Sequence, residues 1–336
     1  MPVIQQVDPH DEQALKAWYR ALRAGAAAGR ERPLIAAYQE VRAALREPGA
    51  EAERSAWAAV ADGAVVGSLL VELYGEGNRR VAEVDVSVPS GERGRGYGSA
   101  LLAHAERIAA RAGRQVLLAE AHVPAGLAPA EHPGTRFALG RGFRSVHRED
   151  HLVLDLPADE EAVAALLAAA EPRRRGYRLD TWSGPCSPEF VAEVARLRSA
   201  MERAVPTGGV HFAPRTWDPV RVREVERRLR RQGFTSIASL ARAADGAPAG
   251  YSELFVPGHN PAEVYQDDTV VLAAHRGRGL GAALKAGNLA RLRTDHPERR
   301  RVHTWTAAVN GPMQRINRAF GFRPVEVAHR LQRDDR

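Results

Sequence analysis

The segment ERGRGYGSALL stands at residues 92–102, and HRGRGLGAALK stands at residues 275–285. Seven of the eleven positions are identical, at a constant offset of 183. The same offset relates DGAVVG (62–67) to DGAPAG (245–250). Because a repeat of this length is a whole domain rather than one unit of a solenoid, the sequence predicts two domains of the same fold.

In each copy the glycine-rich segment lies between a strand and a helix. VAEVDVSVP (81–89) alternates valine with mostly polar residues, a period of two that is typical of a strand. Apolar residues from 101 to 109 then recur at helical spacing. SAWAAVADGAVVGSLLVELY (55–74) predicts two strands joined by an Asp-Gly turn. We therefore expect the α/β class, with a mixed sheet in each of two tandem domains.

The repeat and the segments between its copies predict the domain bounds. We expect an N-terminal domain over residues 1–157 and a C-terminal domain over residues 176–336. ADEEAVAALLAAAEPRRRG (158–176) predicts a linker helix over 158–175, because alanine and leucine are strong helix formers. Each domain is long enough to bury a core of its own.

The composition is that of a soluble globular protein, with 44% hydrophobic and 26% charged residues among 336. The formal net charge is +7, but the basic residues are scattered among acids rather than gathered into one stripe. We therefore expect no nucleic-acid partner. Cys186 is the only cysteine, which rules out an intramolecular disulfide and fits a reducing compartment.

Neither the start of the chain nor its apolar runs predict a membrane partner. Residues 1–13 lack a basic segment followed by an apolar one, the pattern of a secretory signal. The longest apolar run, AVAALLAAA (162–170), is far shorter than the ~20 residues that a membrane span needs. We therefore expect a cytoplasmic protein, either a monomer or a homodimer.

The order strand, R-x-x-G-x-G, helix predicts a site for phosphate groups. Glycine lets the backbone turn sharply and lets a ligand approach the amides closely. Several N–H groups then meet at the positive end of a helix, where arginines add charge-assisted hydrogen bonds. The spacing G-x-G-x-G differs from the dinucleotide fingerprint G-x-G-x-x-G, and no G-x-x-x-x-G-K-[ST] nucleotide loop is present.

The two segments resemble the pyrophosphate loop of the GNAT superfamily of acyl-CoA-dependent N-acyltransferases. The match rests on RGRGYG (93–98) and RGRGLG (276–281), each after a strand. The pair GF recurs near the end of each copy, at 142–143 and 321–322, and TAAVNGPMQRINRAFGF (306–322) resembles the late strand and helix of that family. The layout is similar to that of tandem GNAT proteins of actinobacterial type, which include mycothiol synthases.

This resemblance implies an N-acetyltransferase that uses acetyl-CoA as co-substrate and acetylates a small-molecule primary amine, with no metal. In the C-terminal copy it implies acyl-CoA contacts at Val270, Leu272, Arg276, Gly277, Arg278, Gly279, Leu280, Gly281 and Asn310. In the N-terminal copy it implies contacts at Val86, Val88, Arg93, Gly94, Arg95, Gly96, Tyr97 and Gly98.

A general base is expected on or near the strand before the loop. Asp85 and Asp268 are the acidic pair that both copies share, and Glu253 lies on the preceding predicted strand of the second copy. We expect Asp268 and Glu253 to serve there, with Glu83 and Glu263 as alternatives.

The family often protonates the leaving thiolate with a tyrosine four residues before the glycine of GF. That position is Ala138 in the first copy and Asn317 in the second, where the amide can donate a hydrogen bond. Asn310 matches the family asparagine near the CoA arm, whereas the first copy has Glu131. We therefore expect the second copy to be catalytic and the first to bind acyl-CoA or to act as a scaffold.

Two other functions are compatible with the sequence. The missing tyrosine favours a non-catalytic acyl-CoA binder that acts as a sensor or a partner protein. The acceptor can also be a protein or peptide amine, because the sequence does not show the shape of the cleft. A metal site is not expected, because His122, Glu131 and His132 match no zinc spacing.

Overall fold

The computed structural model describes residues 2–47, 49, 52–75, 77–204, 209 and 212–334. The chain forms two compact units. Unit 1 comprises Met1–Arg148, Thr207–Ala213 and Val325–Arg336, and unit 2 comprises Glu149–Pro206 and Pro214–Pro324. The predicted domain bounds follow the repeat of the sequence and stay a prediction.

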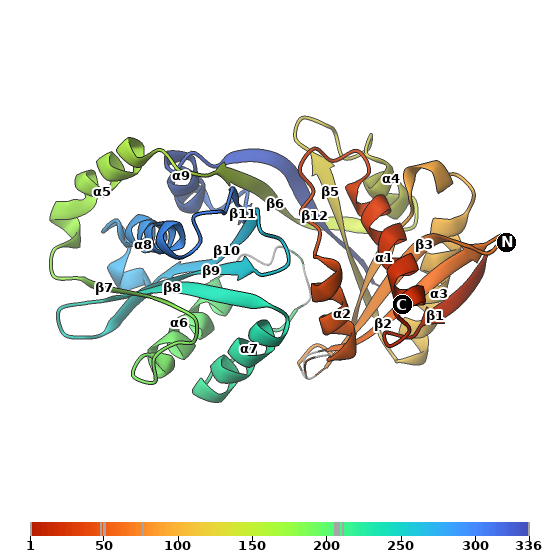
Figure 1. The fold of residues 1–336 in the computed structure, drawn as a ribbon, viewed down its shortest axis with the longest axis horizontal. Helices are drawn as coiled ribbons and strands as arrows, with labels where there is room; N and C mark the ends of the chain where they lie inside the picture. The colour runs from red at the N-terminus through yellow and green to blue at the C-terminus, as the bar shows by residue number, and fades with distance from the viewer. Residues whose placement is uncertain are drawn as a thin grey trace. The chain divides into compact units, whose positions relative to one another are not determined.

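The sheet of unit 1 has the order β1-β2-β3-β4-β5-β12 (Figure 1). All neighbours are antiparallel except β4 and β5, so the sheet is mixed, as predicted. Its strands are β1 (Val3–Val7), β2 (Ala52–Ala61), β3 (Ala64–Tyr74), β4 (Val81–Ser87), β5 (Val116–Pro124) and β12 (Arg323–Asp334). The predicted Asp-Gly turn is confirmed between β2 and β3, where Asp62 has φ 49° and Gly63 has φ 75°.

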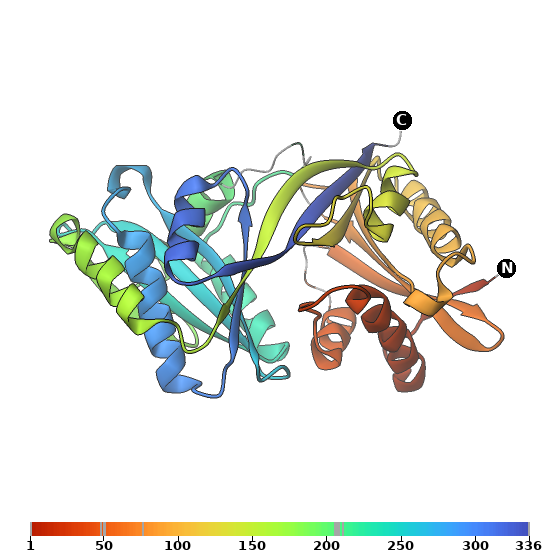
Figure 2. The ribbon, with the colours of Figure 1, turned by 90° about the horizontal axis from the view of Figure 1, so that it is seen from above.

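Helices cover both faces of this sheet. α1 (Glu12–Ala27) and α2 (Tyr38–Arg46) lie on one face, and α3 (Tyr97–Arg111) and α4 (Pro133–Leu139) lie on the other (Figure 2). The Asp11 carboxylate accepts hydrogen bonds from the first turn of α1 and so fixes its start. A short 3-10 turn, η1 (Ser90–Glu92), joins β4 to the loop that precedes α3.

The sheet of unit 2 repeats this plan in the order β6-β11-β10-β9-β8-β7. Its parallel pair is β10 and β11, and the other neighbours within the unit are antiparallel. Its strands are β6 (Arg144–Asp155, of which residues 149–155 belong to this unit), β7 (Arg178–Ser183), β8 (Phe234–Arg242), β9 (Pro248–Pro257), β10 (Glu263–Val271) and β11 (Arg301–Ala307).

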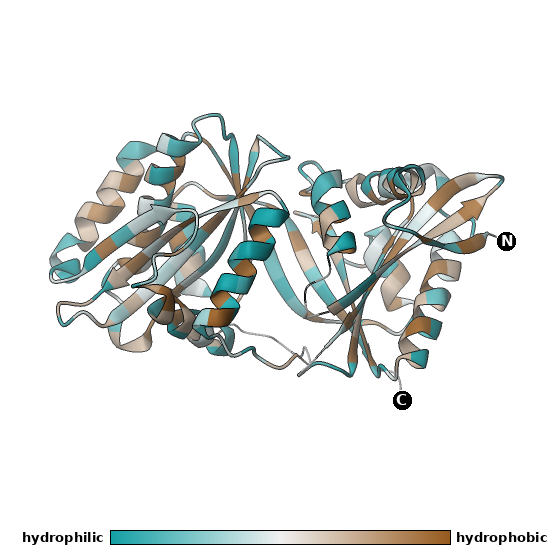
Figure 3. Ribbon diagram, turned by 60° about the horizontal axis from the view of Figure 1, so that its bottom comes forward, coloured by the Kyte–Doolittle hydropathy of each residue, from teal (hydrophilic) through white to brown (hydrophobic). Residues whose placement is uncertain are grey.

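The helices of unit 2 again form two layers. α6 (Val191–Ala204) and α7 (Pro219–Arg231) cover one face, and α5 (Glu160–Arg174), α8 (Leu280–Asp295) and α9 (Gly311–Ala319) cover the other (Figure 1). The 3-10 turn η2 (Ala273–His275) precedes α8 as η1 precedes α3. In Figure 3 hydrophobic residues gather along the strands and on one side of the helices, as expected where helices pack on a sheet.

Lys285, on α8, is an isolated charge in the core of unit 2. It is 2% exposed, and its charged group contacts the ring of Phe322, with 5.5 Å between Nζ and the ring centre. Burial alone lowers the pKa of Lys285 to about 7. Keeping this side chain in the core therefore costs free energy near neutral pH.

We predict that Lys285→Met raises the free energy of unfolding at pH 7 by on the order of 3 kcal/mol. The folded-state pKa is about 7 and the unfolded one is about 10.4. Between these values only the unfolded state keeps the proton, so wild-type stability rises with pH. The gain from Lys285→Met is thus largest below pH 7 and falls toward zero near pH 10.

Denaturant unfolding at several pH values checks this prediction. The control is Lys16→Met, which removes the only other lysine, a residue whose side chain is 60% exposed. That variant is expected to show no pH-dependent gain. A gain from Lys285→Met that stays constant from pH 6 to pH 10 would contradict the prediction.

Candidate active site

β4 and β5 separate part of the way along their length. They pair from Val81 with Val116 to Glu83 with Leu118, and within the described residues their register ends there. β4 stays paired with β3 as far as Ser87. The backbone of residues 84–87 therefore has one edge that no strand covers, and its amide and carbonyl groups are available to an extended ligand.

The loop after this strand is shaped to bind an anion. Gly94 has φ 80° and Gly96 has φ 84°, conformations that side chains rarely adopt, and no atom would lie within 4 Å of a Cβ at either position. Gly96 caps α3, whose first amides have no side-chain partner. Arg93 secures the loop by donating hydrogen bonds to the carbonyls of Val88 (3.1 Å) and Gly25 (3.2 Å).

A cavity of about 950 Å³ joins this loop to the open edge of β4. Seven of the eight contact residues predicted in the first copy line it: Val86, Val88, Arg93, Gly94, Gly96, Tyr97 and Gly98. The eighth, Arg95, forms an ion pair with Glu92 at 3.2 Å. The volume lies at the upper end of the range usual for small-molecule sites.

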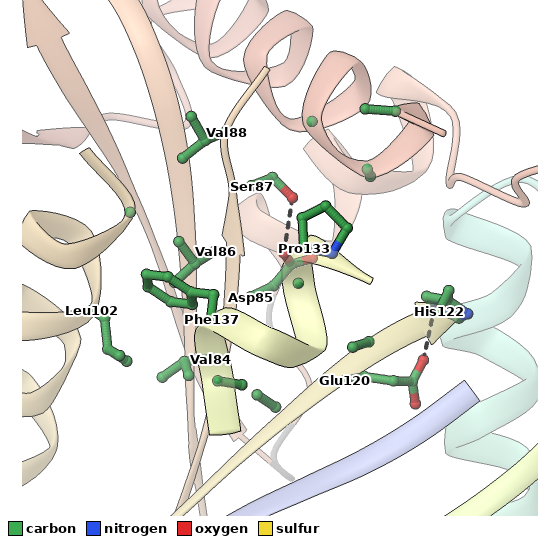
Figure 4. Close-up of a pocket in the computed structure, with 18 of the residues that line it drawn as sticks. Val84, Asp85, Val86, Ser87, Val88, Leu102, Glu120, His122, Pro133 and Phe137 are labelled. Atoms are coloured by element: carbon green, nitrogen blue, oxygen red, sulfur yellow. Dashed lines mark hydrogen bonds and ion pairs between the residues drawn. The ribbon is translucent and has the colours of Figure 1, made fainter. Parts of the chain in front are cut away.

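The two faces of β4 contribute different chemistry to the cavity. Val84 and Val86 point to the side of Leu102 and Phe137, which belong to α3 and α4 (Figure 4). Asp85 and its neighbours two residues away point to the opposite side, because side chains alternate along a strand. That side is covered by α1 and α2 (Figure 2).

Asp85 is the carboxylate of the cavity that lacks a cationic partner among the described residues. Its Oδ1 accepts a hydrogen bond from Ser87 Oγ at 3.1 Å (Figure 4). The side chain is open to the cavity, but the protein close around it raises the pKa of Asp85 by desolvation. A carboxylate of raised pKa and without a counter-ion is suited to bind an ammonium group or to accept a proton.

A chain of ion pairs centred on His122, on the neighbouring strand β5, lines the same cavity as Asp85. His122 Nε2 lies 2.9 Å from Glu120 Oε1, and His122 Nδ1 lies 3.2 Å from Glu326 Oε1. Arg30 donates from Nε to Glu326 Oε2 at 2.8 Å. Burial lowers the pKa of His122, but the two glutamates outweigh it and raise the pKa to about 9. His122 is therefore a cation at neutral pH.

Glu83, an alternative base from the sequence, is already paired. Arg330 donates to its two oxygens at 2.5 and 2.6 Å, and the Tyr74 hydroxyl donates at 2.7 Å. Two residues thus donate three hydrogen bonds to this carboxylate. It lines the cavity but is less available to a ligand than Asp85.

In unit 2 the corresponding loop is partly covered, at Gly279. A Cβ at Gly279 would overlap that of Ala170 on α5, whose Cα would lie 3.6 Å away. Tyr177, just after α5, forms a hydrogen bond with His275 Nδ1 at 2.9 Å and has Arg278 over its ring. Ala170 and Tyr177 thus occupy the space beside Gly279 and Arg278 of the second glycine loop.

Two of the other predicted contact residues of the second copy have structural partners. Arg276 donates from Nε to the Val271 carbonyl at 3.1 Å, as Arg93 does to Val88. Asn310 caps α9, its side chain accepting from Met313 N at 3.3 Å. Gly277 is open, with no atom within 4 Å of a Cβ. The remaining predicted contacts, Val270, Leu272, Leu280 and Gly281, are buried or half-buried beside α8 and β10.

Of the predicted catalytic residues of unit 2, Glu253 and Asn317 are buried and have side-chain partners, and Asp268 is half-buried. Glu253 is 4% exposed and forms an ion pair with Arg198; desolvation raises its pKa to about 7. Desolvation and the neighbouring Asp267 raise the pKa of Asp268 to about 8. Asn317 is fully buried and donates to Thr306 Oγ1 at 2.9 Å.

Sequence reasoning missed part of the first site. The alternation of QVLLAEAHVP (115–124) could have placed Glu120 and His122 on one face of a strand. No local sequence signal indicates Arg30 or Glu326, which are 296 positions apart.

Among the described residues, no group of three or more histidine, cysteine or acidic side chains could hold a metal ion. No helix of the described chain is long and apolar enough to cross a membrane.

Comparisons with known proteins agree with this geometry. Residues 15–132 match the acetyltransferase (GNAT) family. A curated relative, L-2,4-diaminobutyric acid acetyltransferase from Streptomyces avermitilis, is 36% identical over 63 residues, which are 19% of this chain. The chain spans only 35% of the length of that relative.

Two of the solved structures that cover nearly the whole chain also match over most of their own length. A tandem GNAT protein from the clavulanic acid biosynthesis pathway is 27% identical, covers 99% of this chain and 98% of its own, and has a TM-score of 0.78. A GCN5-related N-acetyltransferase from Sphaerobacter thermophilus shares the fold at 18% identity, covers 99% and 95%, and has a TM-score of 0.65. Residues 15–132 thus match the GNAT acetyltransferase family, and the chain as a whole shares the fold of a tandem GNAT protein.

Proposed function

We propose that unit 1 transfers an acetyl group from acetyl-CoA to the primary amine of a small molecule. The main support for this proposal is that Asp85 and the open Gly94–Gly96 loop line the same cavity. A phosphate site, an uncovered strand edge and a carboxylate without a counter-ion are what such a transfer needs.

The phosphate end of the cavity is cationic. The loop amides from Gly94 to Gly98 would hold the diphosphate, with Arg93 fixing the loop. Arg136, on α4, lines the cavity and adds a positive charge there. The uncovered edge of β4 would pair with the amides of the pantetheine arm, which aligns the thioester along the strand.

Asp85 would take a proton from the acceptor ammonium, since only the neutral amine has a free lone pair. The amine nitrogen then bonds to the thioester carbonyl carbon, the carbon–sulfur bond breaks, and the second proton of the nitrogen passes to the leaving thiolate. A backbone N–H on the open edge of β4 would stabilise the oxyanion. Acetyl-CoA supplies the activated acyl group, and its thiol, with a pKa near 8.5, leaves without a tyrosine at Ala138.

The second repeat was expected to be the catalytic one, and that expectation stays a prediction. Ala170 over Gly279 argues for unit 1 instead, because a diphosphate on the second loop would compete with α5 for the same space. A second candidate function is an acyl-CoA binder without turnover. Its support is Ala138, an apolar residue in the core of unit 1 where the family often has an acid.

Calorimetry and a thiol-release assay test these proposals together. We expect one acetyl-CoA to bind per chain and CoA to be released when amines are added. The amines to be assayed are monoamines, polyamines, a lysine-containing peptide and diamino acids. Diamino acids are included because the curated relative is named for a diamino acid. Tight binding without amine-dependent release would favour the binder, and release with the peptide alone would favour a protein acceptor. No binding of acetyl-CoA would overturn both functions.

A further inference from the structure

The strand register defines the part of the cavity that receives the acceptor. Asp85 pairs with Leu70 of β3, and directly paired residues project to the same face of a sheet. On β5, Leu118 pairs with Glu83, which lies on the same face of β4 as Asp85. Glu120 and His122 are two and four residues after Leu118, so their side chains project to that face as well. These side chains therefore share the face covered by α1 and α2, which we call the acceptor side.

The cations on the acceptor side already have acidic partners. Arg30 is held by Glu326, Arg330 by Glu83, and His122 by Glu120 and Glu326. His132, at the rim of α4, has its pKa lowered by burial and by nearby arginines, so it adds no charge at neutral pH. Within the described lining of the cavity, Asp85 is therefore the charged side chain of this side that has no oppositely charged partner and can bind a charged ligand.

The rest of the acceptor side is apolar. Aliphatic side chains from α1, from the segment between α1 and α2, from α2 and from β3 line the cavity: Leu22, Leu34, Ile35, Val41 and Leu70. Ile35, Val41 and Leu70 also pack against the core beneath α1. Such a wall favours a hydrocarbon body over a charged or strongly hydrated one, because it offers no hydrogen-bond partner.

From this arrangement we propose that the acceptor is a monoamine with an apolar body and no carboxylate beside its amine. The inference rests on the proposed function and names its substrate class. One positive charge meets Asp85, and the hydrocarbon part meets the aliphatic wall. A carboxylate next to the amine would lie close to Asp85 with no free cation to pair with it, and like charges so placed repel strongly.

Acceptors that differ only in this carboxylate test the proposal. We compare 2-phenylethylamine with phenylalanine, and tyramine with tyrosine, by kcat/KM in the thiol-release assay. The decarboxylated member of each pair is expected to be favoured by about 100-fold. Phenylalanine methyl ester separates charge from size, because it keeps the bulk but carries no negative charge. The ester is expected to react like the amine.

The possible results distinguish failure of the proposed substrate class from failure of the proposed function. An amino acid that reacts as fast as its amine overturns the monoamine class but leaves the acetyltransferase function in place. An ester rejected as strongly as phenylalanine overturns the electrostatic argument. No release with any acceptor, although acetyl-CoA binds, counts against the proposed function itself.

Discussion

Asp85→Asn is expected to lower kcat/KM for acetyl transfer by about 100- to 1,000-fold, because an amide can neither accept the proton nor balance the charge of an ammonium. The substitution keeps the size of the side chain and can keep the hydrogen bond from Ser87 Oγ. Affinity for acetyl-CoA should therefore stay within about twofold of wild type, as calorimetry can measure, since Asp85 lies away from the phosphate loop.

The repeat provides a matched control for this experiment. Asp268 is the counterpart of Asp85 at the offset of 183, so Asp268→Asn makes the same chemical change in unit 2. We expect that variant to keep nearly full activity. If Asp268→Asn abolished transfer and Asp85→Asn did not, the chemistry would belong to the second repeat.

The pH dependence of the same reaction gives a second readout. Desolvation raises the pKa of Asp85 above its ordinary value of 3.8. Because the base works only when deprotonated, kcat/KM should fall as the pH falls through that raised pKa. Asp85→Asn should lack this acid limb while keeping other ionisations. An acid limb that survives in the variant would assign the base to another residue.

Gly94→Val is expected to weaken acetyl-CoA binding by about 100-fold or more. A β-branched residue is strongly disfavoured at the φ of 80° found there, and its side chain would stand in the open space that the diphosphate needs. Because no atom lies within 4 Å of a Cβ at Gly94, the loss would come from the ligand site rather than from a clash within the core.

Gly277 is the matched position in the second loop, with φ 76° and the same open surroundings. Gly277→Val therefore carries the same backbone strain, and thermal unfolding should show similar losses of stability in both variants. We expect it to leave acetyl-CoA affinity unchanged. A loss of binding in Gly277→Val alone would contradict the assignment of the site to unit 1.

Much of the fold could be predicted from local signals. The alternation in 81–89, the Asp-Gly turn and the glycines before each helix depend on neighbouring residues, whose spacing is visible in the sequence. The offset of 183 showed that the plan occurs twice. Residues of the first loop that the same signals singled out line the cavity, because the backbone bend and the helix start are local properties.

The difference between the two loops could not be predicted, because both have the same local sequence pattern. Ala170 and Gly279 are far apart in the chain and meet only when α5 packs on α8. Likewise Arg30 and Glu326 approach each other only because β12 pairs with β5 in unit 1.

The sequence by itself determined the repeat, the mixed sheets and the positions of two glycine-rich loops, since these follow from residue spacing and from the conformations that glycine allows. Only the tertiary structure decided that Ala170 covers Gly279 while Gly96 stays open, and which carboxylate lacks a counter-ion. Those properties depend on which distant segments come into contact, and pairing of charges across 296 positions leaves no periodic signal in the chain.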